Sequence, residues 1–153
     1  MRTCRLALFI VAAGVLGCEA PGHVIGKAAL SGEGETDAAF RKGAAPIEIW
    51  AKLDGKWRGV KYSKLPILWT IDVKQGGKDR GRISCDSEST TGTLYCGSTT
   101  NIGGVISEDC EVRLTCALPP LEPGEVAVRV VGKKKDPSRI LEIRGMSLVF
   151  REP

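Results

Sequence analysis

Few side chains in this 153-residue chain are of the types that do chemistry in enzymes. His23 is its one histidine, and the glycine- and alanine-rich stretch around it predicts a solvated side chain rather than a catalytic one. The serines lie in no Gly-x-Ser-x-Gly or Ser-x-x-Lys pattern that would mark a nucleophile. The pairs Gly76-Gly77 and Gly103-Gly104 lack a phosphate-loop pattern and predict turns. The sequence therefore predicts a protein that is not an enzyme and needs no cofactor.

Carboxylates remain as candidate ligands and acids. Asp79, Asp86 and Glu88 would hold calcium if they lined one loop end, because that ion takes hard oxygen ligands. Their spacing matches no known calcium loop, so solvated loop acids are the simpler interpretation, as they are for Glu108-Asp109. A carboxylate hydrolase would need two inward-facing acids in one cleft. We expect neither a metal site nor such a cleft.

The first eighteen residues are typical of an export sequence. Arg2 and Arg5 give a basic start, and residues 6–16 form an uncharged apolar run that ends in small residues before Cys18. This is the three-part form of a secretory signal. The apolar run is too short for a transmembrane span, which needs roughly 20 residues.

Val15-Leu16-Gly17-Cys18 resembles the lipobox of bacterial lipoproteins: an aliphatic residue, a variable residue, a small residue and cysteine. The resemblance implies that the Cys18 thiol receives a diacylglycerol and that cleavage falls between Gly17 and Cys18. It also implies acylation of the new amino group, with chains such as palmitate, and an ordinary secretory signal is the alternative. Glu19 rather than Asp after the anchor favours, by the family rule, the outer membrane of a Gram-negative bacterium.

Removal of 17 residues from 153 leaves 136, which is one domain plus a tether. The segment takes two arginines with it, so the net charge falls from +4 to +2, a balance that excludes a strongly basic nucleic-acid binder. Residues 18–43 hold no sustained period of 2 or 3.6, and we expect a lipidated cysteine and a flexible tether there. The ordered domain is expected over residues 44–153.

Four cysteines follow the anchor: Cys85, Cys96, Cys110 and Cys116. An even number in an oxidising compartment predicts two disulfides, and no Cys-x2–4-Cys pair supports a zinc site. On an extended strand, Cys110 and Cys116 would lie about 20 Å apart, far beyond the Cα separation of a disulfide. Cys110 and Cys116 should therefore each pair with Cys85 or Cys96, and we favour Cys85–Cys116 with Cys96–Cys110. The local pairing of 85 with 96 and 110 with 116 would require this segment to bend.

Three tryptophans lie in the first expected strands. Trp69 is in phase with apolar neighbours and should be in the core. Asp54-Gly55 between two alternating runs predicts a hairpin turn, which would make Trp50 and Trp57 cross-strand neighbours on one surface. Such a pair either stabilises the hairpin or binds a sugar or a protein partner. The run 133–135 of lysines could touch anionic headgroups, but a solvated turn is the favoured interpretation.

The mature chain shows period-2 alternation in short runs between turn residues and no helical periodicity over eleven residues. A phase slip at Gly145 predicts a β-bulge or a bend. About eight such strands indicate an all-β antiparallel β-sandwich, with immunoglobulin-like and jelly-roll topologies left open.

The function expected from the sequence is that of an envelope lipoprotein, held at the membrane by lipid on Cys18, whose non-catalytic domain binds an envelope protein or glycan. The alternative is an accessory carbohydrate-binding module that uses exposed Trp50 and Trp57 on one flat face.

Overall fold

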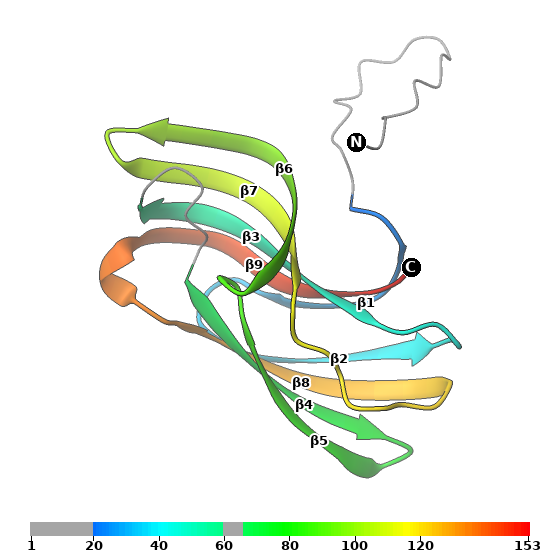
Figure 1. Cartoon of the computed structure of the whole chain (residues 1–153). Coiled ribbons are helices and arrows are strands. Elements are labelled where there is room, and N and C mark those ends of the chain that lie inside the picture. Colours follow the sequence, from blue (N-terminus) through cyan, green and yellow to red (C-terminus); the bar gives the residue numbers. More distant parts are fainter. Residues whose placement is uncertain (1–19, 60–65) are drawn as a thin grey trace, which may run out of the picture.

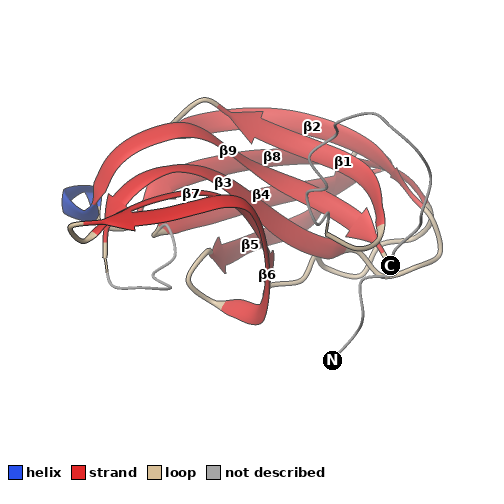
Figure 2. Ribbon diagram, turned by 90° about the horizontal axis from the view of Figure 1, so that it is seen from above, coloured by secondary structure: helices blue, strands red, loops and turns tan. Residues whose placement is uncertain are grey.

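A computed structural model describes residues 20–59 and 66–153. This part of the chain contains nine strands, one short 3-10 helix and no α-helix. The nine strands form two antiparallel sheets. The strands are β1 (His23–Leu30), β2 (Gly34–Lys42), β3 (Glu48–Arg58), β4 (Ile67–Gln75), β5 (Lys78–Asp86), β6 (Thr90–Ile102), β7 (Val105–Leu114), β8 (Gly124–Lys134) and β9 (Ile140–Glu152). The 3-10 helix, Pro137–Arg139, lies in the connection from β8 to β9 at one end of the sandwich (Figure 2).

The two sheets have the orders β1-β9-β3-β7-β6 and β2-β8-β4-β5 (Figure 1). Without β6, eight strands remain as two four-stranded sheets. The first strand then pairs with the last in one sheet, and the second pairs with the next to last in the other. This nested antiparallel order is the jelly roll, with β6 added at the free edge of β7. The predicted sandwich is thus confirmed, and its topology is the jelly roll.

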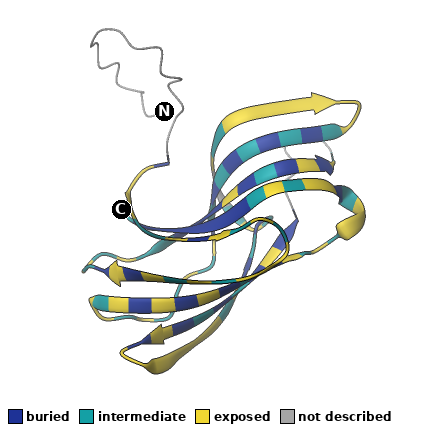
Figure 3. Cartoon of the chain, turned by 180° about the vertical axis from the view of Figure 1, so that it is seen from behind, coloured by how far each residue is buried: buried dark blue, intermediate teal, exposed yellow. Residues whose placement is uncertain are grey.

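Alternation along each strand determines which side chains enter the space between the sheets. In β7 every second residue is buried, from Ile106 to Leu114, and the same alternation runs through β4 and β8 (Figure 3). Period 2 is the geometry of a strand with one covered face. The turn from β4 to β5 holds Gly76 and Gly77 at φ of 58° and 74°, as the sequence predicts. Gly103-Gly104, between β6 and β7, likewise forms a turn with positive φ.

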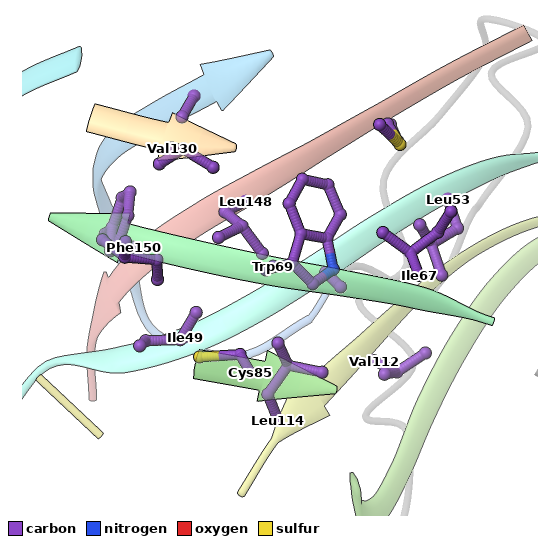
Figure 4. Close-up of a cluster of buried hydrophobic side chains, with 14 of the residues drawn as sticks. Ile49, Leu53, Ile67, Trp69, Cys85, Val112, Leu114, Val130, Leu148 and Phe150 are labelled. Carbon is purple, nitrogen blue, oxygen red and sulfur yellow. The ribbon is translucent and has the colours of Figure 1, made fainter. Parts of the chain in front are cut away.

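Trp69 lies near the middle of the core, as predicted from its phase (Figure 4). Its side chain is fully buried, and its Nε1 donates a hydrogen bond of 2.8 Å to Oγ of the equally buried Ser87. Phe40 and Phe150 stack on one another with ring centroids 4.8 Å apart and join the two sheets. Burial of these rings supplies much of the apolar area that stabilises a sandwich.

Both disulfides have the predicted partners. Cys96–Cys110 joins neighbouring strands β6 and β7 within one sheet, at a Cα separation of 4.0 Å. Cys85–Cys116 joins β5 of the four-stranded sheet to the chain just after β7 of the other sheet, at 5.4 Å. Cys110 and Cys116 do not pair, because the chain between them is extended, as expected.

The expected tether over residues 18–43 is wrong for most of its length. Residues 23–30 and 34–42 form β1 and β2, which pair with β9 and β8 over almost their whole length. The composition of the segment is poor in large apolar residues, so its local pattern is weak. Backbone pairing to strands more than 80 residues later holds it in place, and Ala28 and Phe40 are buried in the core. The ordered domain therefore begins by Ala20 rather than at residue 44.

The hairpin expected at Asp54-Gly55 is also wrong, because β3 runs straight through both residues. β3 is a central strand with β9 on one side and β7 on the other, so both edges are paired along its length. Gly55 is needed for a different reason: a Cβ there would lie 2.6 Å from the backbone oxygen of Glu142. The bulge predicted at Gly145 is confirmed, since the register shifts where Asp54 pairs with Gly145 and Gly55 with Ile143.

Candidate functional site: the outer face and free edge of the five-stranded sheet

Trp50 and Trp57 lie on opposite faces of one strand, which corrects the prediction that they share a surface. Seven positions separate them, and an odd separation on a continuous strand places side chains on opposite sides. Both are 1% exposed. Trp57 points into the core, and Trp50 points outward but is covered. Neither tryptophan therefore offers a face on which a sugar could stack.

The cover over Trp50 is the segment that precedes β1, residues 20–22, which we call the strap. Ala20 is 6% exposed and packs against Trp50 and Val149 on the outer face of the five-stranded sheet. Tyr95 of β6 lies beside this cluster, with its ring centroid 5.7 Å from that of Trp50. The Trp50 Nε1 donates a hydrogen bond of 3.1 Å to Oε2 of Glu48, so the indole is satisfied as well as covered.

Arg151 of β9 binds the strap through hydrogen bonds to its backbone. Its Nη1 donates to the carbonyl oxygens of Ala20 and Gly22, each at 3.2 Å. Its Nε and Nη2 bind the Glu111 carboxylate at 3.1 and 3.0 Å, and its guanidinium carbon lies 5.9 Å from the Trp50 ring centroid. The planar fork of an arginine allows all these contacts at once. The pattern of charged residues in β7 and β9 does not predict that Arg151 and Glu111 are in contact.

Gly22 gives the strap its turn into β1. Its φ is +90°, a region that other residues rarely adopt, and a Cβ there would lie 2.8 Å from the backbone oxygen of Glu152. The strap is thus defined by a buried methyl, two carbonyls on one guanidinium and a glycine that fits closely against the C-terminal strand. In Figure 1 the start of β1 and the C-terminus lie at the same end of the sheet.

The inward face beside Trp57 holds an acid that forms no ion pair with any described residue, and its Oε2 lies 3.6 Å from the Sγ of the disulfide-bonded Cys110. Glu108 is opposite Gly55 in the register, is 8% exposed, and has its pKa raised by burial. The Trp57 Nε1 is buried without a hydrogen-bond partner. These two polar groups share the core-facing side of neighbouring strands, Trp57 on β3 and Glu108 on β7, two register positions apart. Ionisation of a buried carboxylate without a cationic partner destabilises the folded chain.

β6 forms the free edge of the same sheet and is largely exposed where its side chains are described (Figure 3). Its thirteen residues, Thr90–Ile102, include no charged residue and no proline. Ile102 at its end is 79% exposed. By contrast, β5 at the edge of the other sheet carries Lys78, Asp79, Arg80 and Arg82. Charged side chains normally protect edge strands from pairing with other chains.

The acids considered for calcium do not come together. Asp79 and Asp86 lie near opposite ends of β5, about 23 Å apart at the rise of a strand. Asp86 and Glu88 both bind Lys135 instead, at 2.6 and 3.0 Å. Among the residues described, no group of three or more histidine, cysteine or acidic side chains could hold a metal ion.

The remaining predicted sites have mixed outcomes. The three lysines at 133–135 form the end of β8 and its continuation, and Lys134 pairs with Glu33 at 3.6 Å. His23 is exposed at the start of β1 rather than in a tether. The lipobox, Cys18 and Glu19 lie outside the described residues, as does the chain around Tyr62. Within the described part, no helix has the length and apolarity needed to cross a bilayer.

Comparison with known proteins adds no relative. No protein-family model matches the chain, and a search of curated proteins finds no similar sequence.

Proposed function

We propose that this chain is an envelope lipoprotein, anchored by lipid on Cys18, whose non-catalytic jelly-roll domain binds a protein partner. The observation that carries the proposal is the state of the cysteines. All four cysteines of the described residues are joined in two disulfides. Disulfides of this kind persist in oxidising compartments outside the cytosol. An exported chain with a lipobox cysteine then has one thiol left for the lipid.

The intact mass of protein extracted from membranes tests the anchor. We expect loss of residues 1–17, addition of a diacylglycerol and further acylation at Cys18, and two disulfides. The Cys18→Ser variant is the matched control, and it should carry no lipid and leave the membrane fraction. A chain that keeps residue 1 and four free thiols would contradict the proposal.

A protein partner is favoured over a glycan by the two candidate surfaces. A sugar site built on Trp50 and Trp57 is unsupported, because both side chains are buried. The β6 edge has the properties of a strand-addition site. It is additional to the eight strands of the jelly roll, it is stapled to β7 by Cys96–Cys110, and it is uncharged. Strand addition uses backbone hydrogen bonds along such an edge.

The other described edges suit this role poorly. β1 and β2 are consecutive strands that lie against one another where the two sheets meet. β5 is charged along its first half and contains Gly81 at positive φ, where its register against β4 shifts. Bulges and charges at an edge discourage pairing with another strand. The partner is therefore expected to present an extended, largely uncharged segment to β6.

Photo-crosslinking in native membranes tests the β6 edge. A crosslinker at Thr100, which is exposed on β6, should give a discrete protein adduct, whereas one at Ser84, exposed on β5, should not. The Thr100→Lys substitution should abolish an adduct formed from position 102, and Ser84→Lys should not. Equal adducts from both strands, or binding only to polysaccharide, would contradict a protein partner at β6.

A further inference from the structure

The first described residues after the proposed lipid site are fixed to the domain rather than free. In the described part, the strap begins at Ala20, whose carbonyl oxygen accepts a hydrogen bond of 3.2 Å from Arg151. Ala20 is 6% exposed because it packs on Trp50 and Val149. A residue that is both buried and hydrogen-bonded through its backbone does not behave as part of a flexible linker.

Arg151 is itself held on several sides. Its side chain is 10% exposed, and that of its ion-pair partner Glu111 is 13% exposed. The guanidinium also lies over Trp50 and binds the second strap carbonyl, that of Gly22. The strap is therefore tied to β9 and β7, two strands of the sheet's interior, and not to a surface loop.

The covalent distance from the strap to the lipid is short. Cys18 precedes Ala20 by two residues, and two fully extended residues span at most about 7 Å. The Cα atom of an acylated cysteine must remain near the lipid headgroups, since its acyl chains enter the hydrocarbon. Ala20, and with it the part of the outer face around Trp50 and Val149, can then be no farther from the bilayer than this reach allows.

We propose that the strap holds the outer face of the five-stranded sheet against the lipid headgroups, so that the domain has one orientation at the membrane. This inference rests on the proposed lipidation of Cys18. The opposite sheet, β2-β8-β4-β5, then faces away from the bilayer, and the β6 edge lies beside the membrane surface. A domain on a long tether would instead rotate freely and present every face to a partner.

The charges on this outer face are compatible with headgroup contact. Lys27 and Lys52 are exposed there and form no ion pair with any described residue. They line one shallow depression with Asp54 and Asp109, and the Asp54 carboxylate is already bound by Arg144. Two lysines without partners on the face that the strap approaches suit anionic lipid better than hydrocarbon.

Distance-dependent relaxation of a spin label tests the orientation. The full lipidated chain is placed in phosphatidylethanolamine and phosphatidylglycerol vesicles that contain a nickel-chelating lipid. One label is attached through Lys52→Cys on the near face, and a second, in a separate preparation, through Ala127→Cys, exposed on the far sheet. We expect relaxation enhancement several-fold stronger at position 52 than at 127. Equal enhancement at both positions would overturn the inference.

A linker variant is the control for the strap. Ten Gly-Ser residues inserted between Glu19 and Ala20 add a mean reach of about 17 Å while leaving the strap in place. The difference between the two labels should disappear. A difference that persists would show that something other than the short connection sets the orientation, and would also overturn the inference. If the intact mass shows no lipid, the proposed function fails first, and the two failures are thus distinguishable.

Discussion

Arg151 and Glu111 form the most deeply buried ion pair among the described residues, with side chains 10% and 13% exposed and an Nη2–Oε1 distance of 3.0 Å. The pair lies across β9 and β7 beneath the strap, with β3 between them. It orients the guanidinium toward the carbonyls of Ala20 and Gly22, so one interaction both joins the sheet and holds the N-terminal segment.

Loss of the Arg151 side chain should therefore be costly. Arg151→Ala leaves Glu111 as a poorly solvated charge, and removal of one partner of a buried pair costs about 3 kcal/mol or more in the free energy of unfolding. The matched control is Arg129→Ala, whose pair with Glu35 is about half exposed, and which should cost less than about 1 kcal/mol. Urea denaturation of the two variants measures both values. Similar losses would show that the strap pair is no more important than a surface pair.

The two disulfides should differ in their contribution to stability. In the chain-entropy model, closing a loop of 31 residues stabilises by about 3.7 kcal/mol and a loop of 14 by about 3 kcal/mol. Cys85 is also buried in the core between the sheets, whereas Cys96 is partly exposed on the edge strand. The Cys85→Ala, Cys116→Ala double variant should therefore unfold at lower denaturant than the Cys96→Ala, Cys110→Ala variant. The reverse order would mean that the β6–β7 staple, not the link between sheets, stabilises the fold more.

Gly55 should be intolerant of a side chain because of close approach, not because of a turn. Gly55→Ala would place its Cβ within 2.6 Å of the Glu142 backbone oxygen, and overpacking of this kind costs about 1–3 kcal/mol. Gly145→Ala is the control in the same bulge, since a Cβ there meets nothing within 4 Å. Thermal unfolding should show a lower Tm for the Gly55 variant alone. Equal tolerance of both changes would contradict the register described for β3 and β9.

The pH dependence of stability should contain opposite contributions from two acids. Burial raises the pKa of Glu108, so above the ordinary carboxyl pKa the folded chain binds more protons than the unfolded chain, and stability falls as pH rises through that window. The Glu108→Gln variant lacks this loss. The difference in the free energy of unfolding between variant and parent should therefore favour the variant more at pH 7 than at pH 4. Denaturant titrations at the two pH values measure the gain. No difference between the two pH values would mean that Glu108 is solvated.

Asp86 gives the control of opposite sign. Burial raises its pKa, but the hydrogen bonds from Lys135 and from the Glu88 backbone N–H outweigh burial and the pKa is lowered. Its contribution is present above the unfolded-state pKa and is lost as pH falls toward the folded-state value. Asp86→Asn should therefore cost stability at pH 7 and little near pH 2.

The alternation of β4 and β7 was predictable because each lies in a sheet with one covered face. In such a strand, period-2 patterning directly records the side that is buried. The same geometry excluded a local Cys110–Cys116 bridge, and the preferred one of the two remaining pairings is the one that the structure shows. The lipid on Cys18 stays a prediction from the sequence.

The amino-acid sequence by itself determined the all-β class, the turns at the double glycines and the exclusion of a Cys110–Cys116 bridge, because these depend on local geometry and chain separation. The tertiary structure decided that Asp54-Gly55 is not a turn, that residues 23–30 and 34–42 are strands and that Trp50 is covered. Each of these depends on a distant segment, β9, β8 or the strap with Arg151, that pairs with or packs on residues whose local pattern is ambiguous. Such contacts form only when the whole jelly roll closes, so no window of the sequence contains them.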